Sequence, residues 1–300
     1  MWLPNVNSQK SITTKVVGGI GNQLFCYFAG YALARKLDYR LIVDVSDIRH
    51  GRSVHNVSIE SFDLPGEFIS TSNDPIAKLG KRTFNYFSRR LPSSFSLSNN
   101  YYSKVIGYDI ELEKIKSQVK LNGYFQTYKY FEEYSHELLP LKLKTESDWY
   151  KSTLKEIDKT EYISIHLRRG DYRQLSQDYG LLGKDYYRDS LKKLDDLSVD
   201  GRIVVFSDEI YEARKILDGL VGKETYWVNP PMNVSSVESL ALMSQASTNI
   251  IANSTYSWWG AALNPKNPTV IAPSKWFKNL DDPQDLYPPN WHLVESSWEA

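Results

Sequence analysis

The chain has 300 residues, enough for two ordinary domains or one large one. Hydrophobic residues make up 41% and charged residues 24% of it, which excludes a disordered chain, a collagen-like repeat and a coiled coil. Lys+Arg and Asp+Glu number 36 each, so the net charge is zero and binding of nucleic acid through bulk positive charge is disfavoured.

The N-terminal half begins with the pattern of a parallel sheet. Residues 14–17 predict a short strand, and a glycine cluster follows over 18–23. Apolar spacing predicts a helix over 24–37, and the apolar run 41–45 has the length of a strand. This strand, glycine loop, helix and strand form a βαβ unit. Residues 46–120 are less regular, and 119–126 has the pattern of a strand that runs into a loop.

The C-terminal half alternates short apolar strands with helices. We expect strands over 162–167, 203–207, 225–228, 249–252 and 269–272, and helices over 185–197, 209–217, 237–245 and 256–263. The charged segment 141–159 is predicted to be helical and to link the two halves. The predicted fold class is therefore α/β, with two Rossmann-like domains, residues 1–150 and 151–300, facing a central cleft.

Cysteine content and the absence of leader or membrane patterns predict a soluble protein of a reducing compartment, the cytoplasm. Cys26 is the single cysteine, so it forms neither an internal disulfide nor a Cys-based zinc site, and we expect it to be buried on a helix. No signal peptide is visible at the N-terminus. The charge-free stretch 239–265 is too rich in Ser, Thr, Asn and Gln to enter lipid.

Two adjacent arginines follow the predicted strand 162–167. Arg168 and Arg169 stand beside His166, Gly170 and Asp171. Ligands of open parallel sheets bind at the C-terminal ends of strands, and guanidinium groups pair with phosphate oxygens while keeping their charge. Surface ion pairs are the simpler interpretation of a double arginine by itself. The strand end, the glycine and the histidine together favour an anion site.

A second polar cluster follows the predicted strand 249–252. Asn253, Ser254, Thr255 and Ser257 surround the start of the next predicted helix. Hydroxyls and unpaired N–H groups at a helix N-terminus bind anions, although an ordinary helix cap is the simpler alternative for one such segment. Two phosphate-suited segments on one sheet favour a shared ligand.

Two further segments are candidates for binding. The glycine cluster carries Asn22 and Gln23, whose amides can bind hydroxyl groups; it matches neither a dinucleotide fingerprint nor a P-loop, and a structural turn is the alternative. Ser207 and Asp208 end the strand 203–207. The Asp208 carboxylate suits a guanine edge or sugar hydroxyls, whereas a helix cap is favoured for this segment alone.

The sequence predicts neither a metal nor a cofactor. No Asp-x-Asp occurs, the five histidines lack the i, i+4 spacing of zinc proteases, and no Gly-x-Ser-x-Gly elbow is present. Arginines would therefore supply the positive charge that a divalent cation supplies elsewhere.

Five segments resemble, in the same order, the motifs of the bacterial α-1,2-fucosyltransferases of glycosyltransferase family 11. They are 18–25 (GGIGNQLF), 123–126 (GYFQ), 166–172 (HLRRGDY), 206–208 (FSD) and 251–260 (IANSTYSWWG). The third segment and the Ser-Trp-Trp-Gly part of the fifth are specific, whereas the glycine opening alone is not. Cys26 stands where the family often has Gln, and 46–120 matches poorly, which leaves the acceptor open.

The resemblance implies a GT-B-like fold, with an acceptor-side N-terminal domain and a GDP-fucose-binding C-terminal domain. It implies metal-independent, inverting transfer of L-fucose from GDP-β-L-fucose to the 2-hydroxyl of a terminal galactose. Arg168 would neutralise the β-phosphate with Arg169 supporting the loop. The remaining donor contacts implied are His166 and Asp208 near the guanosine, Ser254, Thr255 and Ser257 at the diphosphate, and Asn22 near the reacting sugar or the diphosphate.

Several alternatives stay open at this point. Asp171, Asp44 and Glu209 are candidate general bases, but the arginines should lower the pKa of Asp171 and suit it to orienting them, so no base is assigned. A protein O-fucosyltransferase and a non-catalytic nucleotide- or glycan-binding protein are the competing functions. A lipid-linked acceptor, as in O-antigen biosynthesis, would bring the enzyme to the periphery of the inner membrane. The oligomeric state is left open.

Overall fold

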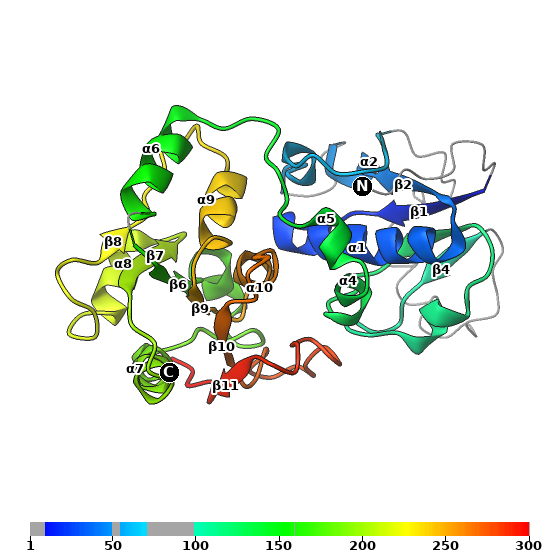
Figure 1. Ribbon diagram of the computed structural model, residues 1–300. Helices are drawn as coiled ribbons and strands as arrows, with labels where there is room; N and C mark the ends of the chain where they lie inside the picture. The colour runs from blue at the N-terminus through cyan, green and yellow to red at the C-terminus, as the bar shows by residue number, and fades with distance from the viewer. Residues whose placement is uncertain (1–9, 50–54, 71–98, 159, 300) are drawn as a thin grey trace. The chain divides into compact units, whose positions relative to one another are not determined.

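The computed structural model describes residues 10–49, 55–70, 99–158 and 160–299 (Figure 1). Contacts divide the chain into two units, the first comprising Met1–Glu60, Leu64–Leu138 and Pro283–Leu286, and the second Ser61–Asp63, Leu139–Asp282 and Tyr287–Ala300. The helix α6 (Asp148–Ile157) belongs to the second unit. The boundary expected at residue 150 would cut this helix, so the division lies earlier, between Leu138 and Leu139. Of the irregular segment 46–120, residues 50–54 and 71–98 lie outside the described residues.

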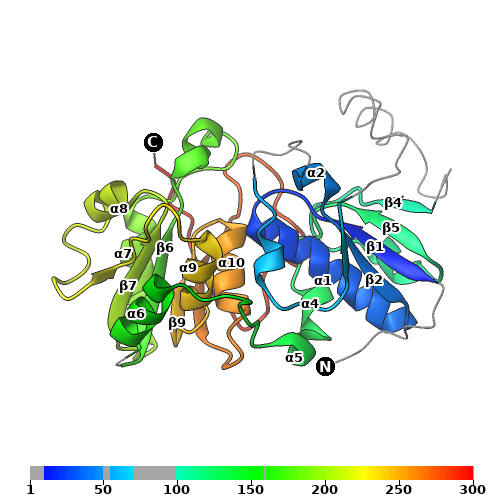
Figure 2. The ribbon, with the colours of Figure 1, turned by 90° about the horizontal axis from the view of Figure 1, so that it is seen from above.

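The first unit is built on a parallel sheet, which has five strands among the described residues, in the order β3-β2-β1-β5-β4. Figure 2 labels β2, β1, β5 and β4 of this sheet. Its strands are β1 (Ser11–Lys15), β2 (Arg40–Asp44), β3 (Glu67–Ile69), β4 (Asn100–Tyr102) and β5 (Val119–Asn122). Its helices are α1 (Ile20–Leu37), α2 (Ser46–Arg49), α4 (Lys129–Glu132) and α5 (Ser135–Leu138), with the 3₁₀ turns η1 (Ile59–Ser61) and η3 (Ile110–Lys114).

Helix α1 lies directly against β1, because a glycine faces the strand. A Cβ at Gly30 would lie 2.6 Å from the Cβ of Thr14, so no larger residue fits between helix and sheet. Tyr27, Phe28 and Tyr31 bury their rings on the same helix. Cys26 is fully buried there, as expected, and burial raises the pKa of its thiol to about 12.

The second unit is built on a parallel sheet with six strands among the described residues, in the order β11-β10-β9-β6-β7-β8. The strands are β6 (Tyr162–Leu167), β7 (Arg202–Ser207), β8 (Tyr226–Trp227), β9 (Thr248–Ile250), β10 (Thr269–Pro273) and β11 (His292–Val294). The helices besides α6 are α7 (Lys184–Asp196), α8 (Ile210–Ile216), α9 (Ser236–Met243) and α10 (Thr255–Ala262), and η4 (Gly170–Leu175) is a 3₁₀ helix.

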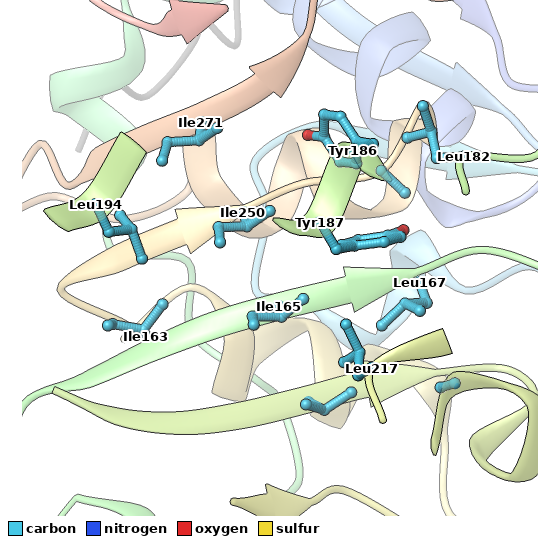
Figure 3. Packing of buried hydrophobic residues seen from close by; sticks show 13 residues of the cluster. Ile163, Ile165, Leu167, Leu182, Tyr186, Tyr187, Leu194, Leu217, Ile250 and Ile271 are labelled. Carbon is cyan, nitrogen blue, oxygen red and sulfur yellow. The ribbon is translucent and has the colours of Figure 1, made fainter. Parts of the chain in front are cut away.

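Helices cover both faces of this second sheet. One face packs Ile163 and Ile165 of β6 against Tyr187 and Leu194 of α7, in a cluster that also reaches α8 (Figure 3). The other face packs Tyr162 of β6 and Val204 and Phe206 of β7 against α6 and α9. β6 is entirely buried because helices cover both faces of the sheet, and its polar residues Ser164 and His166 are buried together with its apolar ones.

The strand order reverses once in each sheet. In the second unit β6 pairs with β7 on one side and with β9 on the other. In the first unit β1 pairs with β2 on one side and with β5 on the other. Such a reversal separates the loops that leave the two neighbouring strands, and open parallel sheets bind ligands at the C-terminal ends of the strands at this point.

Candidate functional site

The C-terminal ends of β6, β7 and β9 carry nearly all the residues selected from the sequence. His166 and the two arginines end or follow β6, Ser207 and Asp208 end or follow β7, and the segment from Asn253 to Ser257 follows β9. Because β7, β6 and β9 are neighbours in the sheet, the three segments meet at its switch point.

Arg168 is the guanidinium that remains accessible at this sheet edge. Its side chain is 26% exposed; Nη2 donates to Asp171 Oδ1 at 2.6 Å, and Nη1 lies 3.0 Å from Asp208 Oδ2. The guanidinium carbon lies 5.4 Å from the centre of the Tyr172 ring. Two carboxylates and an aromatic face thus hold a planar cation in a defined orientation, which suits paired recognition of phosphate oxygens.

Gly170 allows Asp208 to approach the arginine loop. A Cβ at residue 170 would lie 2.6 Å from Asp208 Oδ2. Asp208 Oδ1 accepts a hydrogen bond of 2.9 Å from the Arg169 N–H. Burial raises the pKa of Asp208, and the charge of Arg168 with the Arg169 N–H opposes that rise. The Ser207 hydroxyl accepts from the Glu209 N–H at 3.0 Å and so shapes the turn that carries Asp208.

His166 is a neutral group beneath Arg168. It is 3% exposed, and burial, with a smaller contribution from the Arg168 charge, lowers its pKa to about 3. Its ring lies 5.5 Å from the ring of Tyr256, in the first turn of α10. The Tyr256 hydroxyl donates to the Ser236 carbonyl at 2.7 Å. An uncharged, fixed imidazole at this position can donate or accept a hydrogen bond but carries no charge toward a phosphate.

Arg169 lies inside the protein rather than at the sheet edge. Its side chain is 2% exposed, Nη2 donates to the Leu182 carbonyl at 2.6 Å, and Nη1 lies 2.9 Å from Glu299 Oε1. The two arginines therefore differ in their surroundings. The Arg168 side chain is accessible at the sheet edge, whereas the Arg169 side chain is buried and stabilises the loop through its internal contacts.

The residues at the start of α10 also divide into two groups. Ser254 is the N-cap and Thr255 the first helical residue, and the Ser254 side chain makes no capping bond to the helix. Asn253 Nδ2 instead donates to the carbonyls of Tyr179, Gly180 and Trp276, and the buried Ser257 hydroxyl donates to carbonyls of its own turn. Asn253 and Ser257 thus brace the loop, whereas Ser254 leaves the helix start without a side-chain cap.

Asn22 and Gln23, the two candidates from the glycine cluster, lie in the first unit, in the first turn of α1. Gln23 is fully buried: its Nε2 donates to the carbonyls of Gly18 and Asn56, and its Oε1 accepts from the N–H groups of Ser58 and Ile59. Every hydrogen-bonding position of that amide is used internally, so it holds the loop and offers nothing to a ligand. Asn22, which is partly exposed, accepts from Gln126 Nε2 at 3.0 Å.

The candidate bases differ in their surroundings. Asp44 is 1% exposed, and Lys120 Nζ lies 2.9 Å from its Oδ2. Its pKa is lowered because hydrogen bonds from Ser46 and Lys120 outweigh the effect of burial. Asp171 is occupied by Arg168, and Glu209 pairs with Arg173. Each of the three carboxylates is already engaged with a cation.

Sequence reasoning did not assign a role to several residues of these two sheet edges. Tyr172, Tyr256, Glu299 and Gln126 contact predicted site residues. Tyr172, Tyr256 and Gln126 lie within the five motif segments, whose other residues point to a site. Glu299 lies outside these segments, and its partner Arg169 is distant in sequence, so no local pattern identifies it.

Among the described residues, no group of three or more His, Cys, Asp or Glu side chains is arranged to hold a metal ion. Within the same residues, each helix lacks either the length or the apolar character needed to cross a bilayer.

Comparison with known proteins agrees with the motifs. The sequence model described as "Glycosyl transferase family 11" matches residues 91–295. The O-antigen biosynthesis glycosyltransferase WbnK of Escherichia coli is 32% identical over 287 residues, which cover 87% of this chain and 93% of WbnK. An α-1,2-colitosyltransferase of Escherichia coli is 27% identical over 292 residues, covering 95% and 99% of the two chains.

Solved structures share the fold. Fucosyltransferase NodZ from Bradyrhizobium has a TM-score of 0.55 at 12% identity, covering 86% of this chain and 95% of its own. A NodZ α-1,6-fucosyltransferase crystal soaked with GDP-fucose has a TM-score of 0.52 at 14% identity, covering 92% and 100%. With the two parallel sheets, this likeness confirms the expected GT-B-like α/β fold class.

Proposed function

Because the chain belongs to glycosyltransferase family 11, we propose that it transfers L-fucose from GDP-β-L-fucose to the 2-hydroxyl of a terminal galactose, with inversion at the sugar carbon. The acceptor is an oligosaccharide or a polysaccharide repeat of O-antigen type, in line with the named function of WbnK. The reaction takes place in the cytoplasm, at the periphery of the inner membrane when the acceptor is lipid-linked. The second unit binds the donor and the first unit binds the acceptor.

The observation that carries this proposal is the position of Arg168. It is a partly exposed, oriented guanidinium at the switch point of a parallel sheet, on the strand next to the one that leads into α10. A departing GDP gathers negative charge on its β-phosphate. Donors that are already aimed at that charge stabilise the transition state more than the bound substrate, and so accelerate the reaction.

The other residues act around that cation. Ser254 and Thr255 bind the diphosphate at the start of α10, where helix N–H groups favour an anion. His166 and Asp208 bind the guanosine, and Asn22 lies toward the reacting sugar. Arg169, Asn253, Ser207, Ser257 and Gln23 hold these groups in place through the internal bonds described above. Asp171 orients Arg168, and no carboxylate is assigned as the base.

Metal independence belongs to the same proposal. The sequence has no Asp-x-Asp, and the arginine loop places fixed positive charge where a bound cation would otherwise neutralise the diphosphate.

A second donor is favoured by one specific observation, the 27% identity with an α-1,2-colitosyltransferase. Colitose is L-fucose without its 3-hydroxyl, so GDP-colitose would present the same diphosphate and the same reacting carbon. The two donors differ only in a hydroxyl that neither Arg168 nor the α10 start would contact.

One assay tests the proposal. The purified protein is mixed with lactose and either GDP-fucose or GDP-colitose, with and without EDTA, and released GDP and the linkage of the product are measured. Transfer from GDP-fucose to the galactose 2-hydroxyl that persists in EDTA supports it. Transfer from GDP-colitose alone would show that GDP-colitose, not GDP-fucose, is the donor. Loss of transfer in EDTA would refute metal independence. Binding of GDP without turnover on any galactoside would indicate a non-catalytic binding protein.

A further inference from the structure

The turn after β5 has features that neither the donor site nor the core of the first unit explains. Residues 123–126 follow β5 directly, and β5 is the neighbour of β1 at the switch point of the first sheet. The Gln126 N–H donates to the Ile106 carbonyl at 2.7 Å, so this turn lies beside the loop that follows β4. A Cβ at Gly123 would lie 2.8 Å from the Cβ of Ser103 in that same loop.

The backbone of this turn is strained. Phe125 is a buried aromatic residue with φ +52°, a left-handed conformation that bulky residues rarely adopt. Its carbonyl accepts a hydrogen bond of 2.9 Å from the Thr127 N–H, which fixes the tight turn. Backbone strain of this kind persists where the surrounding structure imposes it, and it is concentrated at ligand sites.

The strained turn presents an amide with unused capacity. Gln126 is 7% exposed and its Nε2 donates to Asn22 Oδ1 at 3.0 Å. Gln126 Oε1 is buried and has no hydrogen-bond partner among the described residues. An unsatisfied buried carbonyl oxygen costs free energy unless a ligand or water donates to it. Asn22 lies in the first turn of α1, just after the glycine loop that follows β1, so the amide pair joins the two strand ends at the switch point.

The same turn presents an aromatic ring to solvent. Tyr124 is 46% exposed, whereas its neighbour Phe125 is fully buried. In the adjoining loop Val105 is 46% and Ile106 37% exposed. Aromatic and aliphatic side chains beside uncharged amides are suited to a neutral sugar, whose ring has an apolar face and a rim of hydroxyls.

We propose that Tyr124 and Gln126 form the subsite for the acceptor's terminal sugar, a neutral galactoside. The Tyr124 ring stacks on the apolar face of the sugar, and Gln126 Oε1 accepts a hydrogen bond from one of its hydroxyls. Asn22 orients the Gln126 amide. The inference rests on the proposed function for the identity of the sugar, and it adds the residues that bind the acceptor.

The test separates acceptor binding from donor binding. In Tyr124→Ala we expect the KM for lactose to rise about tenfold, since one aromatic contact is removed, while the Kd for GDP is unchanged. Tyr124→Phe keeps the ring and should restore the KM to within about twofold of the wild type. Gln126→Leu keeps the volume but removes the acceptor oxygen, and should also raise the KM for lactose at least about tenfold.

Tyr211→Ala is the matched control, because Tyr211 is an exposed tyrosine of α8 outside both sites. Saturation-transfer NMR with lactose provides a second readout that needs no turnover. If the wild type turns over and both Tyr124→Ala and Gln126→Leu keep a wild-type KM, the subsite is refuted and the proposed function stands. If no turnover occurs but the lactose signal depends on Tyr124, the subsite stands and the proposed function fails.

Discussion

Arg168 Nη1 lies 3.0 Å from Asp208 Oδ2, and this ion pair joins the loop after β6 to the loop after β7. Both side chains are 26% exposed, so solvent screens the attraction and the pair contributes little to stability. Under the proposed function, the donor's diphosphate would therefore take the place of the Asp208 carboxylate without a large cost. Until then the ion pair would hold the guanidinium in position.

Replacement of Arg168 should affect catalysis more than folding. We expect Arg168→Ala to lower kcat by about 10²-fold or more, the scale of losing one preorganised donor to a developing charge. Arg168→Lys should be similarly poor, because an ammonium cannot reproduce the two parallel bonds of a guanidinium. Steady-state kinetics with GDP-fucose and lactose measure both.

Arg188→Ala serves as the control for that experiment. Arg188 is an exposed arginine of α7 that pairs with Asp185 and Asp189. Its loss changes the net charge equally, so a comparable fall in kcat would show that the effect of Arg168 is not local.

Gly170→Ala should weaken donor binding through Asp208. The added methyl would lie 2.6 Å from Asp208 Oδ2, so the carboxylate or the loop has to move. We expect the Kd for GDP to rise roughly tenfold, since tightly coupled contacts interact by about 0.5–3 kcal/mol. In an Asp208→Ala background, Gly170→Ala has no carboxylate to displace and should raise the Kd for GDP much less. Equal effects of Gly170→Ala in both backgrounds, measured by calorimetry, would contradict this coupling.

His166 should make the protein less stable in acid. The pKa of His166 is about 3 in the folded chain and 6.5 in the unfolded chain. Between pH 3 and pH 6.5, the unfolded state therefore binds a proton that the folded state does not bind. The stabilisation is fully present above pH 6.5 and is lost as the pH falls toward 3. Relative to His166→Gln, the wild type should lose about 2 kcal/mol of unfolding free energy between pH 7 and pH 5. Urea denaturation at both pH values measures it, and parallel changes in the two proteins would argue against a neutral buried histidine.

Arg169 should behave as a structural residue. Arg169→Ala removes the buried donor to the Leu182 carbonyl and the partner of Glu299, and should cost about 2–4 kcal/mol of stability. Glu299 is 39% exposed, so Glu299→Gln leaves a solvated amide and should cost less than about 1 kcal/mol. Thermal melting compares the stabilities of the two variants. If Arg169→Ala were as stable as Glu299→Gln, the structural role of Arg169 would be refuted.

The buried strands and the edge strand β8 could be predicted from sequence, whereas the edge strands β3, β4 and β11 could not. β6 is observed at Tyr162–Leu167, as predicted, because a strand buried on both faces is rich in apolar residues. β11, β3 and β4 have three residues each and no fully buried one, so their composition resembles that of loops. The start of β1 is predicted three residues late, because Ser11 and Thr13 are polar and leave Ile12 as the single apolar residue before Thr14.

Within the candidate site, residue types were predictable but their directions were not. The motifs identified both arginines, yet one guanidinium faces the sheet edge and the other is bonded to Leu182 and Glu299. The Gln126 amide became visible only when the fold placed it against Asn22, 104 residues away in sequence. Local patterns specify a strand end, whereas tertiary contacts decide which of its side chains stay available.

The bond between Arg169 and Glu299 also bears on how the enzyme is made. The arginine loop is synthesised long before the segment that secures it, and the Trp298 ring that packs against Gly180 arrives equally late. During synthesis on the ribosome, the arginine loop therefore lacks these two contacts until residues 298 and 299 have emerged. A nascent chain stalled before that point should leave this loop open to proteolysis.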